Sequence, residues 1–544
     1  MLTFLHCYTD ELWKGYEING LISKGFGIRF PQSKPLPDNE KFNVLAAKNG
    51  KLYDFVKQNR CPLYIDRLQG GIYIDDYEYD SELLGEYERI LGDDFLGLQM
   101  HEWLSNYRGD VVNKLGDLPA EEWTEQGIEA HIRKKYSYGH ILLESMTVGE
   151  MARAGKPTSW RDIYRNMTDI YRDRLQKYKK LVPVDSYYMM YPFEAELGAK
   201  IIMPEVGAQI RDMRLQMSFA RGVTKAYGIK LGAYYEPWGG EPFSACNYHK
   251  NSKNEWNLYG ADFPFETKGE NGGSSRSLQW RVLLYAYLCG AEYISEEWGG
   301  YNTFLDCEEY KLSEYGLVKK RFLDFVDKYS DIGEKITPVA VVISNDLPCY
   351  TIGDKKDMLF GFPLEGDEAA LYSRVREGVE MIFSNSTPMI GGRREINTLT
   401  NSRVPDAVDM LNEGDGSALE NYKYLVDLTG DAAFAQRHNN CIAPEAVAQT
   451  LRGLLPCRVE GEAHYLINKC GDGGYYLTVF NHSGVVRSLD EGEYVLPEAT
   501  PEPTRTAIGT TLSSSTTTSA SMRTPFATRW MLPSTPWTAP PIRN

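Results

Sequence analysis

Motifs for metal, nucleotide and serine-hydrolase chemistry are missing from this sequence. It contains no His-Glu-x-x-His, no Walker loop and no Gly-x-Gly-x-x-Gly after a strand, and its eight histidines do not cluster at ligand spacings. Gly-x-Ser-x-Gly is also absent, which leaves a serine-hydrolase elbow without support. We therefore expect no metal and no cofactor.

Paired cysteines and excess basic charge are also lacking. The nine cysteines are scattered without a Cys-x-x-Cys pair, which is typical of reduced thiols rather than of a disulfide framework. Lys and Arg number 59 against 75 Asp and Glu, and the formal charge of -16 argues against nucleic acid as a partner. A neutral substrate suits this charge. The 37 tyrosines and 10 tryptophans suit sugar faces, although both residue types are also common in cores.

Long hydrophobic runs are absent too. No segment approaches membrane-spanning length. The first residues lack a basic leader and an apolar signal region, and Asp10 and Glu11 interrupt them at once. We expect no membrane contact and a cytoplasmic location, or a secreted one if a native signal has been removed.

One pattern occurs three times in the middle of the chain. A short apolar run ends in a glutamate, which is followed either by Val-Gly or, one or two residues on, by Trp-Gly-Gly. The three runs are 199–207, 231–240 and 291–300, and helical patterns separate them. A strand, an acid at its carboxyl end and a helix, repeated, is how a (β/α)8 barrel presents carboxylates at its catalytic face.

The chain before and between these runs alternates strand and helix patterns at the spacing of parallel βα units. The expected strands are 25–30, 63–66 and 95–103, and the expected helices are 41–57, 81–91, 121–135, 159–180, 209–227, 278–289 and 310–329. Asp185 and Ser186 predict the cap of a short helix that ends near Leu197. The apolar run 337–343 is either the last barrel strand or the first strand of the next domain.

The length of the chain predicts more than one domain. We expect an α/β protein with a (β/α)8 TIM barrel over 1–336 and a small α/β domain of flavodoxin or amidotransferase type over 337–458. A short C-terminal β domain over 459–500 contains a hairpin and stops about halfway. The Thr/Ser/Pro-rich segment 501–544 has no periodicity, which is typical of a low-complexity tail or of an out-of-frame product; the incomplete β domain favours the second.

Glu205 and Glu297 are the catalytic pair that this pattern suggests. Glycosidic bonds are cleaved between two carboxyl groups, one a proton donor and the other a nucleophile or a base. Glu205 shares strand parity with Met203, and its structural alternative is a buried ion pair with Arg211 or Arg214.

The second glutamate of the pair comes from a doublet. Alternation along the strand places Ser295 and Glu297 inside the barrel and Glu296 outside. Alignment with the strand that ends at Glu236 favours Glu296 instead. We prefer Glu297 on the alternation.

Further residues at the same strand ends are candidates for substrate binding. They are His101, Glu102, Trp103, Tyr235, Glu236, Trp238, Glu296 and Trp298. The aromatic rings would stack on sugars, and Glu236 would bind a hydroxyl or be a rim residue bonded to the next loop. For His101 the usual alternative is a satisfied histidine in a core network. Arg221 and Gly222 are expected to tether a helix to a strand rather than to touch substrate.

At the strands of Glu205 and Glu297 the chain resembles the clan-A retaining glycoside hydrolases. The resemblance implies a TIM barrel with an acid/base glutamate after its fourth strand and a nucleophile glutamate after its seventh. A barrel followed by a small α/β domain and a β domain is similar to the three-domain β-galactosidases. The chain departs from the family where Pro204, rather than the usual Asn, precedes Glu205.

The resulting hypothesis is an enzyme, a retaining glycosidase that acts on β-linked oligo- or polysaccharides. Glu205 would protonate the leaving oxygen and Glu297 would attack the anomeric carbon. A carbohydrate-binding barrel without catalysis is the first alternative. A polysaccharide lyase is the second, and the scarcity of Arg near the strand ends counts against it. The expected partner is a carbohydrate, and a homo-oligomer is left open.

Overall fold

The computed structural model describes most of the central part of the chain. The described residues are 3–7, 26–29, 48, 51–60, 62–65, 80–135, 143, 145–185, 188–207, 213–236, 249–250, 256–257, 276–296, 312, 314–347, 350–351, 357–383, 402–461, 463–480, 512–513 and 526–531. Among these residues, no helix is both long and apolar enough to cross a membrane.

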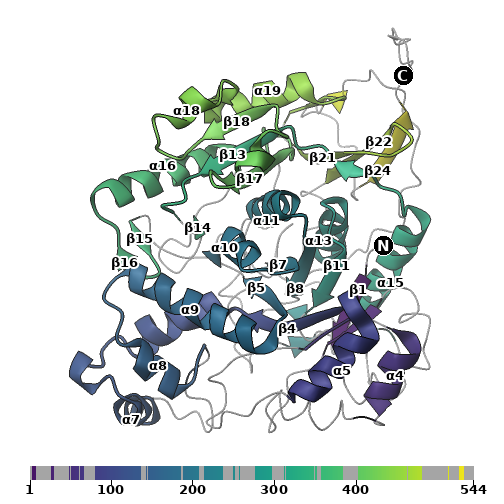
Figure 1. Cartoon of the computed structure of the whole chain (residues 1–544). Helices are drawn as coiled ribbons and strands as arrows, with labels where there is room; N and C mark the ends of the chain where they lie inside the picture. The colour runs from purple at the N-terminus through teal and green to yellow at the C-terminus, as the bar shows by residue number, and fades with distance from the viewer. Residues whose placement is uncertain are drawn as a thin grey trace, which may run out of the picture.

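A curled sheet of eight parallel strands lies at the centre of the molecule (Figure 1). Its strands are β1 (Thr3–Cys7), β2 (Phe26–Arg29), β3 (Leu63–Ile65), β4 (Phe95–His101), β5 (Leu181–Asp185), β7 (Ile201–Gly207), β8 (Lys230–Glu236) and β11 (Tyr293–Glu296). Each strand pairs in parallel with its neighbour in chain order, and β1 pairs with both β2 and β11, so the ring of pairing closes. The expectation of an α/β fold is confirmed.

Helices connect most of these strands, as parallel pairing requires. They are α4 (Lys51–Asn59), α5 (Ser81–Leu91), α6 (Trp103–Arg108), α7 (Glu125–Lys135), α8 (Val148–Ala154), α9 (Trp160–Tyr178), α10 (Tyr191–Glu196), α11 (Met213–Tyr227), α13 (Arg276–Leu288) and α15 (Glu314–Lys328). Capping residues in the local sequence determine where several of these helices begin. Asp80 caps α5 by accepting from the N–H groups of Glu82 and Leu83, and Ser159 with Asp162 forms a capping box at α9.

Two strands of the ring are absent from the sequence-based expectations. Thr3–Cys7 pairs with β2, and Leu181–Asp185 pairs with β4 and β7, where a helix cap was expected at Asp185. Their presence moves every later strand by two positions. The sequence left the strand of Glu205 as the fourth or the fifth; it is the sixth strand of the ring, and the strand of Glu296 is the eighth.

The buried residues divide into a cluster inside the ring and a larger cluster outside it. The inner cluster contains Tyr64, Leu96, Val182, Val184, Ile201, Met203, Tyr234 and Tyr293. On β3, β7, β8 and β11 the next residue along the strand, such as Ile202 or Tyr235, belongs to the outer cluster. This alternation is the period of two that a strand imposes on its side chains. On a ring strand without a bulge, a residue can thus be assigned to the inside or the outside from its parity.

Strand β4 changes its parity at Gly97. The register between β3 and β4 shifts there, because Leu63 pairs with Phe95 whereas Tyr64 pairs with Gly97. Gly97 has a φ of 111°, and a Cβ at this position would lie 2.3 Å from the carbonyl oxygen of Lys180. Only glycine fits this bulge. Leu98 and Met100 consequently join the outer cluster, which leaves Gln99 and His101 facing inward.

A second, smaller sheet packs against the ring through α11 (Figure 1). It contains β13 (Val339–Ile343), β17 (Val408–Asn412), β18 (Tyr424–Asp427) and β19 (Cys441–Ile442), all parallel, in the order β17-β13-β18-β19. The run 337–343 is therefore a strand of this sheet and not of the ring. The helices α16 (Gly366–Ile382), α17 (Gly416–Leu419), α18 (Phe434–Arg437) and α19 (Val447–Leu454) accompany this sheet.

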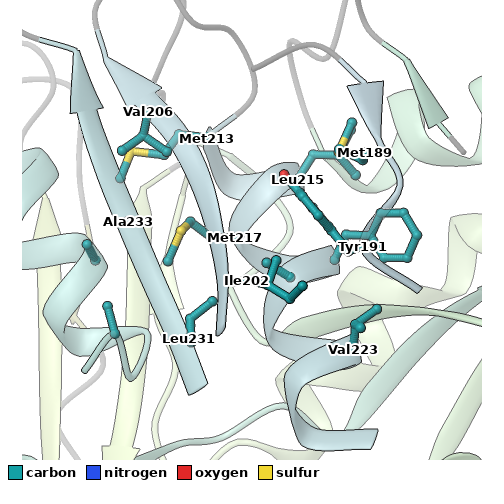
Figure 2. Packing of buried hydrophobic residues seen from close by; sticks show 14 of the residues in the cluster. Met189, Tyr191, Ile202, Val206, Met213, Leu215, Met217, Val223, Leu231 and Ala233 are labelled. Atoms are coloured by element: carbon teal, nitrogen blue, oxygen red, sulfur yellow. The ribbon is translucent and has the colours of Figure 1, made fainter. Parts of the chain in front are cut away.

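Helix α11 is covered on both sides. Met213 and Met217 turn toward β7 and β8, as Figure 2 shows. On the other side the helix contacts β17, and a Cβ at Gly222 would lie 2.1 Å from the carbonyl oxygen of Met410. Beside it, Arg221 donates to Asp409 at 2.6 Å. The expected role of Arg221 and Gly222 as a tether between helix and strand is confirmed.

An antiparallel sheet follows, in the order β12-β21-β22-β24. Its strands are β12 (Glu334–Lys335), β21 (His464–Lys469), β22 (Gly474–Phe480) and β24 (Phe526–Met531). The hairpin β21–β22 was expected from the sequence. Strand β24 comes from the segment 501–544, for which no element was expected, and it pairs with β22 from Gly474 to Val479.

Candidate active site

The candidate site lies at the carboxyl ends of the ring strands, on their inner face. Glu205 on β7 has the parity of Ile201 and Met203, which are both in the inner cluster. It is fully buried, and its strand neighbour on β8 is Tyr234. A carboxyl group buried at this end of a parallel sheet lies where α/β proteins place their reactive groups.

His101 and Glu102 approach Glu205 from the end of β4. The bulge at Gly97 turns His101 inward, where its ring lies 5.3 Å from that of Tyr234 in an edge-on arrangement. Glu102 follows with a φ of 46°, in the left-handed region that residues with a Cβ rarely adopt. Its N–H donates to the Val184 carbonyl at 2.7 Å, which holds the turn against β5. Strained backbone of this kind is concentrated at functional sites.

The three side chains converge on one point. One nitrogen of His101 and one carboxylate oxygen from each of Glu102 and Glu205 all lie within 4.8 Å of one another. His101 Nε2 is 3.8 Å from Glu102 Oε2, and the Glu102 side chain is 31% exposed whereas His101 and Glu205 are buried. Glu102 therefore connects a buried carboxyl group to solvent.

This arrangement supports two kinds of chemistry. Two carboxyl groups at such a distance favour sharing one proton, and a protonated glutamate beside an ionised one is what acid-catalysed glycoside cleavage requires. The same histidine and carboxylate atoms also form a donor set for a divalent transition metal. Metal-site motifs in a sequence depend on fixed spacings within one segment. They did not reveal this donor set, because its members come from two strands.

The inner face around these residues carries more polar groups than the sequence indicated. Ser295 on β11 shares a hydrogen bond of 2.5 Å with the hydroxyl of Tyr64 on β3. Gln99 on β4 is fully buried, and within the described residues its amide makes no hydrogen bond. Tyr64, Gln99 and Tyr234 were not predicted, whereas alternation along the strand had placed Ser295 inside. Strand parity identifies Tyr234 and Ser295, but Gln99 requires knowledge of the bulge.

Glu296 points away from this cluster. It is fully buried in an ion pair with Lys319 of α15 and accepts a hydrogen bond from Gln279 of α13 at 3.2 Å. Alternation placed Ser295 inside and Glu296 outside, and the structure has this arrangement. The expectation that Glu296 binds substrate is wrong, because the side chain is enclosed between β11 and the helices.

Two aromatic candidates also face outward. Tyr235 belongs to the outer cluster and is fully buried, so the tyrosine of β8 that reaches the inner face is Tyr234. Trp103 is buried in the outer cluster as well, with its ring 5.3 Å from that of Tyr171 on α9. Neither Tyr235 nor Trp103 is a stacking platform for a sugar, contrary to expectation.

Other predicted residues lie outside the described part of the chain. Glu297, Trp238 and Trp298 are among them, as is Arg211. Glu236 ends β8, and only its backbone is described. Arg214, the other expected partner of Glu205, instead lies 3.5 Å from Asp406 and donates to the Val404 carbonyl.

A pair of acids behind the site was missed by the sequence analysis. Asp185 ends β5 with the outward parity of Leu181, and Glu194 lies on α10; both are fully buried. Burial raises the pKa of Asp185 well above its usual range, and the neighbouring Glu194 raises it further. Burial likewise raises the pKa of Glu194 to about 8. Asp185 was interpreted as a helix cap, which concealed the pair.

Comparison with solved structures finds remote likenesses. A β-galactosidase from the Antarctic haloarchaeon Halorubrum lacusprofundi is similar with a TM-score of 0.37 and 10% identity, over 78% of this chain and 68% of that one. An α-L-fucosidase isoenzyme 2 from Paenibacillus thiaminolyticus is similar with a TM-score of 0.30 and 10% identity, over 77% of this chain and 50% of that one. No protein-family model matches. No curated protein matches either.

Proposed function

We propose that the chain is a glycoside hydrolase that cleaves β-linked oligo- or polysaccharides by a retaining, two-glutamate mechanism. The observation that supports it is the convergence of Glu102 and Glu205 at the carboxyl ends of the parallel strands, with one oxygen of each within 4.8 Å of the other. Retaining enzymes hold their two carboxyl groups about 5–5.5 Å apart, whereas inverting enzymes leave about 6.5–9.5 Å for a water molecule. This criterion applies to the proton donor and the nucleophile, which are Glu102 and Glu236 in this proposal, and the Glu102–Glu205 separation does not decide between the two outcomes.

The observed number of strands changes which glutamates we propose as the proton donor and the nucleophile. In this proposal the curled sheet is a (β/α)8 TIM barrel, in which the fourth strand is β4 and the seventh is β8. The resemblance to clan-A hydrolases then assigns the proton donor to Glu102 and the nucleophile to Glu236. Glu205 lies beside Glu102 and favours its protonated form. Glu297 is the alternative nucleophile, from the next strand of the ring.

The sugar would bind over the open end of the ring. Glu102 is the partly exposed member of the cluster, so it can reach a leaving oxygen that arrives from solvent. His101 and Tyr234 would contact the bound ring from below. Trp238 and Trp298 follow the seventh and eighth strands and would provide stacking faces.

The test is a set of aryl β-glycosides offered to the wild type and to Ala variants of Glu102, Glu205, Glu236 and Glu297. We expect activity on one sugar that falls by roughly 100-fold or more in the Glu102 and Glu236 variants. Azide should restore both, with a β-glycosyl azide from Glu102→Ala and an α-glycosyl azide from Glu236→Ala. An α-azide from Glu297→Ala would transfer the nucleophile role to that residue.

Two outcomes would contradict the proposal. Sugar binding that is unchanged in all four variants, with no turnover of any glycoside, would leave a carbohydrate-binding barrel. An unsaturated product that absorbs in the ultraviolet would indicate a lyase.

A metal-dependent hydrolase is the second candidate, favoured by the donor set of His101, Glu102 and Glu205. Dialysis against a chelator distinguishes the two. Full activity after dialysis supports the two-glutamate enzyme, whereas loss that Zn²⁺ or Mn²⁺ restores supports the metal enzyme. His101→Ala should abolish metal binding in calorimetry under the second candidate.

A further inference from the structure

Arg376 occupies a position in the middle of an apolar helix face. Along α16 the buried residues Tyr372, Val375, Val379 and Ile382 follow the spacing of a face that packs on a core, and Arg376 lies among them with 5% of its surface exposed. An arginine at such a position usually extends its charged end to solvent. The Nη1 atom of Arg376 is instead buried and has no hydrogen-bond partner among the described residues.

Other buried cations of this chain lie beside an acid. Arg221 contacts Asp409 at 2.6 Å, and Lys335 contacts Asp406 at 2.7 Å. Within the part of the chain that the structure describes, Arg376 has no such ion pair, although the whole sequence contains 75 acids. An uncompensated buried charge is strongly unfavourable, and a guanidinium group, unlike an amine, does not relieve this cost by releasing its proton. This position therefore favours an anion that another molecule supplies.

Two aromatic rings lie near this guanidinium group. Its carbon is 6.0 Å from the centre of the Tyr372 ring, which in turn is 6.1 Å from the centre of the Tyr350 ring. A ring at the first distance attracts a cation only weakly and does not replace a counter-ion. Tyr350 belongs to the short strand β14 (Tyr350–Thr351), which pairs with β6 (Tyr188–Met189), shortly after the ring strand β5. The cation thus lies close to a contact between the ring and the segment that follows β13.

We propose that Arg376 binds an oxyanion at the contact between α16 and β14. The planar guanidinium group matches two oxygens of a phosphate, sulfate or carboxylate group, which it binds through two parallel hydrogen bonds. Such a ligand supplies the negative charge that Arg376 does not receive from the described side chains. The oxyanion is either an inorganic ion or a group carried by a sugar. This inference does not depend on the proposed glycosidase activity.

Thermal unfolding of the full chain tests this site. The probes are sodium phosphate, sodium sulfate and sodium glucuronate, each compared with sodium chloride at the same ionic strength. We expect at least one of the three oxyanions to raise the melting temperature of the wild type by roughly 1–3 °C at about ten times its dissociation constant. A rise with phosphate or sulfate alone identifies an inorganic ion as the ligand, and a rise with glucuronate alone identifies a carboxylated sugar.

Two substitutions of Arg376 separate its charge from its shape. Arg376→Met removes the cation and keeps an unbranched apolar side chain, so it should abolish the rise in melting temperature. In chloride alone this variant should melt no lower than the wild type, because the uncompensated charge is gone. If Arg376→Met does not fold, Arg376→Lys keeps a charge without the planar fork and should weaken oxyanion binding by roughly 10-fold or more in calorimetry.

Arg374→Met is the matched control. Arg374 lies two residues before Arg376 on the same helix, but its side chain is exposed. Its substitution should leave the rise caused by the oxyanion unchanged, which excludes a general effect of surface charge. Melting temperatures of the wild type that are equal in chloride and in all three oxyanions would overturn the inference. A rise that persists in Arg376→Met would overturn it as well.

Discussion

Asp409 is the side chain whose loss should most weaken the contact between the two parallel sheets. It is fully buried on β17 and accepts four hydrogen bonds: from Arg221 at 2.6 Å, Lys225 at 3.0 Å, Thr337 at 2.7 Å and Tyr422 at 2.9 Å. Arg221, the first of these donors, is itself only 3% exposed. Substitution to Asn keeps the volume and removes the charge.

The magnitude follows from the pKa and from the burial of the arginine. Desolvation raises the pKa of Asp409, but the nearby Arg221 and Lys225 outweigh this effect and lower the pKa from 3.8 to about 2. At about 1.4 kcal/mol per pKa unit, this difference represents roughly 2–3 kcal/mol of stability. Asp409→Asn also leaves Arg221 buried without its anion, and breaking a buried pair costs about 3–5 kcal/mol. We therefore expect Asp409→Asn to lower the free energy of unfolding by an amount in the upper part of this range of about 3–5 kcal/mol.

Urea unfolding at neutral pH measures this loss. The matched control is Asp431→Asn, because Asp431 pairs with Arg437 at the surface, where solvent screens the pair and its loss should change stability little. Adding Arg221→Met to Asp409→Asn should recover part of the loss, since the stranded charge is then removed. A loss below about 1 kcal/mol in Asp409→Asn, equal to the control, would refute the reasoning.

The pH dependence of the same variant has a fixed sign. Because the pKa of Asp409 is lower in the folded state, its carboxylate stays charged between about pH 2 and pH 4, where the same group of the unfolded state has taken up a proton. The contribution of Asp409 is therefore complete above about pH 4 and is lost as the pH falls toward 2. The stabilities of the wild type and of Asp409→Asn should converge over that range.

Two further substitutions test buried contacts against neighbouring controls. Lys319→Met removes the buried cation that pairs with Glu296 and should cost about 3–5 kcal/mol in urea unfolding, whereas Lys320→Met alters an exposed pair and should cost below about 1 kcal/mol. Gly222→Ala places a Cβ 2.1 Å from a carbonyl oxygen of β17 and should cost about 1–3 kcal/mol. Gly85→Ala in α5 has open space around its Cβ and should be neutral or stabilising. Equal melting temperatures for the two variants would contradict the close packing of α11.

Regular elements were predictable where one residue pattern decides the structure. The apolar spacing along 209–227 predicted the helix observed at Met213–Tyr227, and Ser81–Leu91 was predicted with its bounds. Leu181–Asp185 was not, because Pro183 weakens its strand signal and Asp185 before Ser186 is typical of a helix cap. Missing this strand and Thr3–Cys7 changed the strand count, and with it the roles proposed for the glutamates.

The candidate site was predictable in part for a similar reason. Strand parity identified the inner face of β7, so Glu205 was found, and it placed Glu296 outside. Parity failed on β4, because the bulge at Gly97 changes which residues face inward and its effect depends on the passing backbone of Lys180. The Asp185–Glu194 pair and the ion pair of Glu296 with Lys319 each join a strand to a helix that follows it, and such contacts depend on packing that local patterns do not report.

Helix α11 has a consequence for any attempt to produce the parallel ring as a separate polypeptide. All residues from Met213 to Thr224 are buried, since β7 and β8 cover one side and β17 the other. A polypeptide that ends at residue 336 would lack Asp406 and Asp409, the acids that Arg214 and Arg221 contact. Its new surface would combine apolar side chains with uncompensated guanidinium groups, which favours aggregation. Truncation for crystallisation or directed evolution should therefore keep the second sheet.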